Sequence, residues 1–434
     1  MITLENEQRG YYTLGFLNIK IHTKEDLGNL NQLISKQSPV FSTFLHEYIH
    51  FLQNFTTTSG LYSSQFYIQF LKYTISKIKE NEDDIINLPL TIDNDYNRES
   101  LNKLNSIYLG QSGFIRNRVR YENYSSEKTE ITDISDNNLI IVNKYFIEFT
   151  DFDTHKFEKY HFGTIALKEY VAHKIQNSFQ SIQHPDIPYL IAELIIDKEL
   201  PELKDNDNLK ILLCDASLMN LYPAQFFFET IERLKQKVYP KNPTEFYNYI
   251  FKDISYDGKL GKFDNQIQLF NYIYDQIKYD YNDAFKSKIF INELNWFLHI
   301  LKNARELRIK NPTFILNLIN SKGKFTIELK RIIKSLGTPF FINELNDGGF
   351  VPPRKLKKIP NQTYILLAAS ELLFNAFAKN EFGLYGFCSK NFAKQNPTNE
   401  LCQTNPFKKM NEPEACPFIQ LSKTWGIHEK VYVR

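Results

Sequence analysis

The sequence predicts an α+β protein that is predominantly helical, and three observations support this fold class. Apolar residues recur at helical spacing behind Ser38-Pro39, which is typical of an amphipathic helix. Most of the C-terminal half of the chain repeats the helical pattern. Runs of β-branched and aromatic residues at 11–22, 138–150 and 156–162 predict strands instead. We therefore expect a small sheet beside a large helical region.

The chain is too long for one ordinary hydrophobic core. It has 434 residues, of which 42% are apolar, and chains of this length usually divide into two or three units. The changes in pattern predict a first unit with the small sheet at 1–182 and a helical region at 183–340. A C-terminal helix with an irregular, cysteine-containing tail is expected at 341–434.

The first 180 residues combine strands with helices. The first of these helices begins at Ser38-Pro39, with Ser as its N-cap and Pro at its first position, and Gly60 is expected to end it. The polar segment 81–135 is rich in Asn, Asp and Ser and predicts loops. The other helices of this part are expected at 62–80 and 165–180.

The remainder of the chain predicts one helix after another. The segment 336–361 is the exception, because its three glycines and four prolines indicate an irregular connection. The expected helices are 187–199, 216–238, 243–252, 263–289, 291–309, 312–320, 325–335 and 362–379.

Charge and hydropathy argue against several classes of function. Lys and Arg total 52 against 50 Asp and Glu, and no basic block stands out, so we expect no nucleic-acid partner. No stretch approaches the roughly 18 apolar residues of a membrane span, and the N-terminus lacks a secretory signal pattern. Only four cysteines occur, so a disulfide framework is not expected. Together these features predict a cytoplasmic protein without a membrane partner.

One pattern in the first helix indicates a metal site. Residues His46-Glu47-Tyr48-Ile49-His50 read H-E-x-x-H. Histidines four residues apart project from the same helix face, so both imidazoles can bind one metal ion. Glu47 lies beside them, where its carboxylate can take a proton from a water on the metal. The pattern predicts a Zn²⁺ site with Glu47 as the general base. The alternative is two partly exposed histidines on an ordinary helix.

A zinc site of this kind needs a third ligand from elsewhere in the chain, and Glu169 is the first candidate. Lys168 and Glu169 fall in the helix expected at 165–180, where the pattern is otherwise apolar. The small Ala172, three residues further on, would let this helix pack closely against another. The alternative is a solvated glutamate paired with a neighbouring cation.

Other side chains compete for a place in the site. Glu193 and Glu229 are the next carboxylates to consider, and His161 and His173 are rival ligands. His161, at the end of an expected strand, is the better candidate for a catalytic donor to an oxyanion. Tyr170 could donate in the same way.

The H-E-x-x-H helix and the downstream run A-L-x-E-x-x-A at 166–172 together resemble the gluzincin-type zincin metallopeptidases. The resemblance covers about residues 40–180. In that group the third zinc ligand is a glutamate on a helix downstream of the active-site helix. The resemblance therefore implies that 1–182 is a zincin-like catalytic core.

The same resemblance implies roles for individual residues. His46, His50 and Glu169 would be the zinc ligands, and Glu47 would be the general base. The implied reaction is hydrolysis of a peptide or protein amide bond, and an edge strand within 138–162 could hold an extended substrate. A large helical region beside the core would restrict access, which would suit a specific protein substrate or a regulatory protein partner.

Two other classes of function stay open. Glu47 and His50 also form an E-x-x-H pair, as in di-iron carboxylate proteins, but Glu169 and His173 are one residue too far apart to supply the second pair. The other class is a non-catalytic helical interaction protein that keeps the motif as a relic or a structural metal site.

The tail contains a second group of metal-ligand residue types. Cys388, Cys402 and Cys416 are spaced 14 residues apart, without a C-x-x-C pair. With His428 or Cys214 as a fourth ligand they could form a structural metal site. Buried thiols that simply pack the tail are the alternative.

Overall fold

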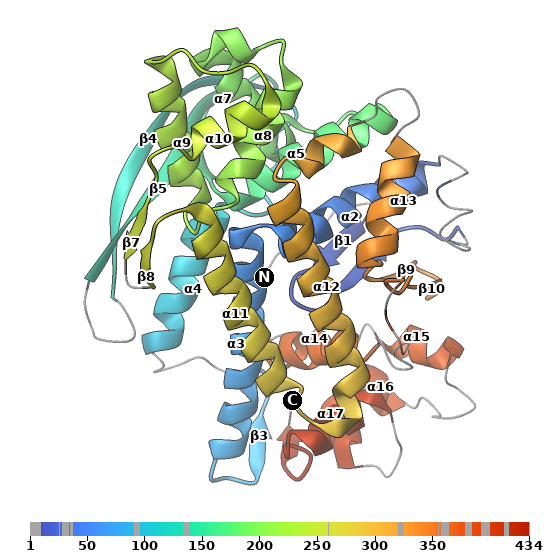
Figure 1. Cartoon of the computed structure of the whole chain (residues 1–434). Helices are drawn as coiled ribbons and strands as arrows, with labels where there is room; N and C mark the ends of the chain where they lie inside the picture. Colours follow the sequence, from blue (N-terminus) through green and yellow to red (C-terminus); the bar gives the residue numbers. More distant parts are fainter. Residues whose placement is uncertain are drawn as a thin grey trace.

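Helix α2 (Pro39–Thr56) lies at the centre of the fold (Figure 1). In this computed structural model 16 of its 18 residues are buried, so α2 is enclosed by other elements. Its packing partners are α3 (Thr58–Glu80), α5 (Thr164–Phe179), α12 (Ile291–Lys310), β1 (Gly10–Thr13) and β2 (Asn18–Ile21). The structure describes residues 10–25, 27, 34, 38–90, 96–132, 139–258, 260–319, 325–354, 356, 364–377, 384–391, 400–411 and 416–433.

The fold class is α+β and predominantly helical, as predicted, and the described strands form small sheets. One sheet has the order β1-β2-β9-β10, with β9 at Phe340–Ile342 and β10 at Gly348–Gly349. Segment 336–361, predicted to be irregular, thus supplies two short strands. They form because β9 pairs in parallel with β2 from the N-terminal part of the chain, a long-range contact that local composition does not report.

The single strand predicted at 11–22 is wrong, because β1 and β2 form an antiparallel hairpin instead. The chain reverses through Gly15 and Leu17, which have φ values of +78° and 52°. Positive φ is a conformation that glycine adopts without steric cost. The turn places β1 at the edge of the described sheet, directly beside α2.

Helix α2 begins as predicted but ends before Gly60. The Ser38 hydroxyl accepts a hydrogen bond from the Phe41 amide, which caps the first turn. Thr57 separates α2 from α3, and Gly60 lies inside α3. A Cβ atom at Gly60 would lie 2.4 Å from the Gln53 carbonyl oxygen. Glycine is therefore needed here for close helix contact and not as a helix stop.

The described parts of the polar segment 81–135 are mostly helix and strand, whereas the sequence predicted loops. It contains β3 (Ile85–Asn87), α4 (Tyr96–Leu109) and β4 (Val119–Thr132). β4 pairs with β5 (Leu139–Asp151), and β5 pairs with β6 (Phe157–Phe162), all antiparallel. A neighbouring strand satisfies the backbone of β4 even though its own side chains are mostly polar.

In the helical region the helix predicted at 216–238 corresponds to α9 (Pro223–Lys235), which begins later, and α8 (Asp207–Ser217) was not predicted. Pro223 is the first residue of α9, since a proline inside a helix would remove a backbone hydrogen bond. Helices α11 (Gln266–Ala284) and α12 lie side by side (Figure 1). The remaining elements are α6 (Asp186–Tyr189), α7 (Ile191–Glu199), η1 (Pro201–Leu203), α10 (Pro243–Ile250), β7 (Tyr256–Gly258), β8 (Gly261–Phe263), η2 (Lys288–Phe290), η3 (Phe314–Leu318) and α13 (Phe325–Leu336).

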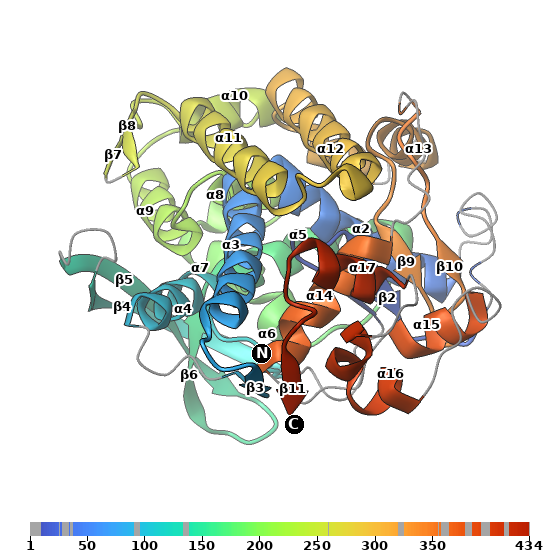
Figure 2. The same ribbon diagram turned by 90° about the horizontal axis from the view of Figure 1, so that it is seen from below.

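The C-terminal segment returns to the N-terminal part of the fold. Strand β11 (Val431–Val433) pairs in parallel with β3 (Figure 2). A continuous hydrophobic core includes Phe16 near one end of the chain and Tyr432 near the other. The three-unit division at 1–182, 183–340 and 341–434 stays a prediction. The other elements here are α14 (Tyr364–Phe377), α15 (Leu384–Asn391), α16 (Glu400–Thr404), η4 (Pro406–Asn411) and α17 (Pro417–Thr424).

A buried ion pair ties α12 to α8 and to the end of α2. The Arg308 guanidinium contacts both carboxylate oxygens of Asp215, at 2.7 and 3.0 Å, and both side chains are fully buried. Its Nε also donates to the Thr56 carbonyl oxygen at 2.7 Å. Among the described helices, none is both long enough and apolar enough to cross a membrane.

Candidate metal centre

His46 and His50 occupy one face of α2, and Glu169 faces them from α5. The His46 and His50 Nε2 atoms are 3.1 Å apart. The Glu169 carboxylate oxygens lie 3.0 Å from Nε2 of His46 and 3.3 Å from Nε2 of His50. Donor atoms on a zinc ion at 2.0–2.1 Å in tetrahedral geometry are separated by about 3.3 Å. The three side chains therefore form a group that could hold a metal ion.

Helix α5 reaches this position because its start packs closely on α4. A Cβ atom at Gly163 would lie 2.4 Å from the Gly110 backbone nitrogen, so only glycine permits the approach. Thr164 then donates its hydroxyl to the Tyr108 carbonyl oxygen at 2.8 Å. These contacts fix the first turn of α5 and place Glu169 against α2.

Two glutamine side chains orient the histidines. The Oε1 atom of Gln53 lies 2.9 Å from Nδ1 of His50, and that of Gln176 lies 3.2 Å from Nδ1 of His46. Each glutamine also donates its amide N–H to a backbone carbonyl oxygen, of Lys168 or of Ser42. The amide oxygens must therefore accept protons from the imidazoles.

This hydrogen-bonding pattern favours a cation in the site. With Nδ1 protonated on both rings, the Nε2 lone pairs of His46 and His50 point toward each other and toward the Glu169 carboxylate. Three acceptors within 3.3 Å repel one another unless a proton or a metal ion lies between them. Two neutral imidazoles and a carboxylate are also a usual donor set for catalytic zinc. The residues present thus fit the ion.

Glu169 is poised to remain ionised. Burial alone would raise the pKa of its carboxyl group, but His50 and His46 lower that pKa to well below its ordinary range. An ionised carboxylate is the form that binds a metal cation.

Glu47 lies beside the three ligand candidates without joining them. Its side chain is buried, which raises the pKa of its carboxyl group to about 7, although nearby His46 opposes the shift. The backbone of Tyr12 on β1 hydrogen-bonds to this carboxylate. A Cβ atom at Gly10 would lie 3.4 Å from Cγ of Glu47, so β1 runs directly past the group. The Glu47 carboxylate is therefore near both the ligand candidates and strand β1.

His161, expected to be a catalytic donor, lies outside this group. Strand β6 alternates its faces, so Tyr160 and Phe162 are buried toward the core while His161 faces the other way. Its ring packs on Phe146 and contacts the backbone of Ile107. Within the described residues His161 has no contact with His46, His50, Glu169 or Glu47. Strand alternation explains this position of His161, and its catalytic role stays a prediction.

The other rivals for the third ligand position are also engaged elsewhere. Glu193 pairs with Lys174 and Lys210, and Glu229 accepts from the Gln225 amide at 2.7 Å. His173 packs on the ring of a neighbouring histidine, and burial lowers its pKa to about 3.

The structure adds neighbours that the sequence analysis missed. His184 and Tyr189 lie against His46, with ring centroids 6.1 and 6.0 Å away. Gln176 lies two helical turns beyond Glu169, and Gln53 lies one turn beyond His50. Those helical spacings were a signal that could have suggested both glutamines. Nothing in the local sequence suggested His184 or Tyr189.

The cysteine tail does not form a second metal group in the described part of the chain. Cys388, Cys402 and Cys416 come close enough to influence one another, and burial together with the other two thiols raises the pKa of Cys388 to about 12. The one cluster of described residues with the ligand spacing for a metal ion is that of His46, His50 and Glu169. A metal site with His428 or Cys214 therefore has no support.

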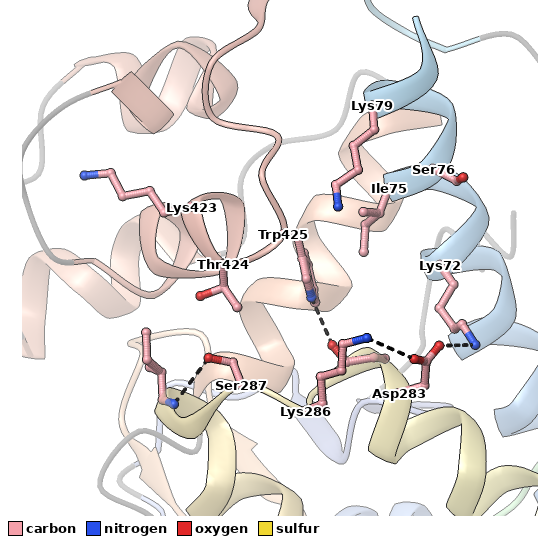
Figure 3. Close-up of a pocket in the computed structure, with 12 residues that line it drawn as sticks. Lys72, Ile75, Ser76, Lys79, Asp283, Lys286, Ser287, Lys423, Thr424 and Trp425 are labelled. Atoms are coloured by element: carbon pink, nitrogen blue, oxygen red, sulfur yellow. Dashed lines mark hydrogen bonds and ion pairs between the residues drawn. The ribbon is translucent and has the colours of Figure 1, made fainter.

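A separate cavity of about 740 Å³ lies between α3, α11 and α17 (Figure 3). Four lysines and one aspartate line it. Asp283 lies 2.7 Å from Nζ of Lys72 and 3.5 Å from Nζ of Lys286, so part of the positive charge is already paired. None of the metal-ligand candidates lines this cavity.

Comparisons with protein-family models, with curated proteins and with solved structures found no match for this chain.

Proposed function

We propose that this protein is a zinc-dependent metallopeptidase. One observation carries the proposal: the Nε2 atoms of His46 and His50 and the carboxylate of Glu169 meet at 3.0–3.3 Å, with Glu47 beside them. Three protein ligands leave the fourth position of a tetrahedral zinc ion open, which distinguishes catalytic from structural zinc sites.

The chemistry follows from the chain's own groups. A bound zinc ion would polarise the substrate carbonyl and make a coordinated water more acidic. Glu47 accepts one proton from the attacking water while the water oxygen bonds to the carbonyl carbon. The π-electron pair of the carbonyl group moves onto the carbonyl oxygen. When the carbonyl re-forms, the C–N bond breaks and Glu47 returns the proton to the leaving amine. No other reactant is required.

An extended peptide is the substrate class that the surroundings favour. β1 is the edge strand of its described sheet, and the Tyr12 backbone hydrogen-bonds to the Glu47 carboxylate. Backbone groups of alternate residues point to the same side of a strand, so Gly10 shares this direction. A peptide that added to this edge would place its carbonyl groups beside Glu47. This edge is better placed for substrate than the strands at 138–162 that the sequence suggested.

The competing functions are less well supported. A di-iron site needs several bridging carboxylates, whereas the cluster in the described residues has one carboxylate and two histidines. A purely structural or interaction role would give no reason for the buried Glu47 beside the ligands, although it is compatible with metal binding.

Metal content and hydrolysis together test the proposal. Purified wild-type protein and a His46→Ala variant are compared by elemental analysis, and wild type and Glu47→Gln by cleavage of a quenched-fluorescent peptide library. We expect one zinc per wild-type chain, a strong loss of zinc in His46→Ala, and zinc without cleavage in Glu47→Gln. Two irons per chain, or equal cleavage by wild type and Glu47→Gln, would overturn the proposal.

A further inference from the structure

The cavity between α3, α11 and α17 contains none of the groups of the candidate metal centre. Its volume of about 740 Å³ falls in the range of roughly 300–1,000 Å³ that is usual for small-molecule sites. Side chains from three parts of the chain that are distant in sequence line it (Figure 3). Its shape therefore depends on the folded chain.

The cavity carries an excess of positive charge. Four lysines line it, and Asp283 is the single acidic residue among the lining side chains. The Asp283 carboxylate is shared, because it lies 2.7 Å from Nζ of Lys72 and 3.5 Å from Nζ of Lys286. Asp280 places a second carboxylate 3.3 Å from Nζ of Lys72. The charge of Lys72 is thus balanced, whereas the mostly exposed Lys286 is held only loosely.

Lys79 has no partner for its charge. Its ammonium group makes no hydrogen bond or ion pair within the described part of the chain. The side chain extends from α3 toward Trp425, whereas the amino group of Lys423 points away from that ring (Figure 3). A Cβ atom at Gly426 would lie 3.9 Å from Nζ of Lys79. Lys79 and Lys286 therefore present two cations that an anion in the cavity can balance.

The rest of the lining combines an apolar wall with hydroxyl groups. Nε1 of Trp425 donates to the Ala284 carbonyl oxygen at 3.0 Å, which fixes the indole against the end of α11. Ile289 is an apolar lining residue that is 54% exposed. Ser287 accepts from the Ile289 amide and keeps its own proton to donate, and Thr424 adds another hydroxyl. Such a lining suits a ligand with an apolar part and several anionic oxygens.

We propose that this cavity binds a small organic molecule that carries two or more phosphate groups. Phosphate oxygens accept strong hydrogen bonds from ammonium groups, and one phosphate monoester carries a charge of about −1.5 to −2 near neutral pH. Lys79 and Lys286 hold the phosphates, and Trp425 and Ile289 contact the apolar part. An acidic peptide is a poorer fit, because the lysines surround a hollow of small-molecule size instead of following an extended groove.

Calorimetric titration with ATP, without magnesium, tests the inference, and adenosine serves as the probe without phosphates. Both probes are titrated into wild type and into the double variant Lys79→Gln/Lys286→Gln. The control is Lys278→Gln/Lys302→Gln, which removes the same number of charges from exposed lysines on α11 and α12 that do not line the cavity. Repeating the titrations at higher salt measures the electrostatic share of binding.

We expect wild type and the control to bind ATP with equal affinity and the cavity variant to bind it about 10²-fold more weakly. That loss corresponds to a factor of about ten for each charged hydrogen bond. Salt should weaken ATP binding, and adenosine should bind far more weakly than ATP. No ATP binding by wild type, or equal ATP affinity in wild type and the cavity variant, would overturn the inference. Neither result bears on the metallopeptidase proposal, which concerns other residues.

Discussion

The side-chain oxygen of Gln176 lies 3.2 Å from Nδ1 of His46 and accepts its proton. Because Gln176 and Glu169 are on the same helix, α5 supplies both a ligand candidate and the support for a ligand on α2. The same oxygen lies 3.1 Å from Nε2 of His184, which links that histidine to the group. One helix thus positions most of the site.

Removing either supporting amide should weaken zinc binding. Gln176→Leu and Gln53→Leu each leave an imidazole without its orienting acceptor, so we expect zinc affinity to fall by about 10–100-fold, the usual range for such partners. Chelator competition measures the affinity. Gln225→Leu, which removes an amide that donates to Glu229 on the same helix α9, is the control and should bind zinc as wild type does. Equal affinities in all variants would mean that the glutamines do not orient the ligands.

The third ligand can be tested by neutralising its charge. Glu169→Gln keeps the size of the side chain but removes the carboxylate that faces both histidines, so zinc stoichiometry or affinity should fall strongly. Glu229→Gln changes the rival carboxylate on α9 and should leave zinc binding unchanged. If Glu169→Gln bound zinc like wild type while Glu229→Gln did not, the assignment of the ligand would be reversed.

His161 should affect stability in acid more than catalysis. Burial, and then Lys144, lower its pKa from 6.5 to about 4, so between these values the unfolded chain binds a proton that the folded chain does not. Stability therefore falls as pH falls from about 6.5 to 4. We expect the loss of unfolding free energy between pH 7.5 and 5 to be smaller in His161→Gln than in wild type.

Urea unfolding at the two pH values measures this difference. The contributions of titrating groups that both proteins share cancel in the comparison. The difference between the two proteins in the loss of unfolding free energy from pH 7.5 to 5 therefore reports the contribution of His161. Identical pH dependence in both proteins would contradict the prediction. A folded His161→Gln protein that has lost peptide cleavage at pH 7.5 would instead restore the catalytic role that the sequence suggested.

The buried ion pair between Arg308 and Asp215 should matter greatly for stability. Asp215→Ala leaves a buried guanidinium without its carboxylate, and breaking such a pair usually costs about 3–5 kcal/mol. The free energy of unfolding in urea measures the loss. Glu306→Ala removes the partner of exposed Lys310 on the same helix and should cost no more than about 1 kcal/mol. Similar losses of unfolding free energy in the two variants would show that burial of the ion pair does not determine how much it contributes to stability.

Several elements followed from local sequence. The start of α2 agreed with prediction because the Ser38 cap and Pro39 act within one turn. The region around β4 did not, because its polar side chains reveal nothing about the partner strand β5. Likewise, the break between α8 and α9 was missed although Pro223 signalled it. The error at β4 arose because pairing with another strand outweighed local composition, whereas the error at α9 ignored a local signal.

The sequence by itself determined that His46 and His50 share a helix face with Glu47 beside them, because a four-residue spacing fixes their relative positions within α2. It also offered Glu169 as the third member. Only the tertiary structure decided that Glu169 meets the histidines across 119 residues, that β1 runs past Glu47, and that the ring of Tyr189 lies against that of His46. These relationships depend on the packing of α5, α6 and β1 around α2, and no local spacing encodes such long-range contacts.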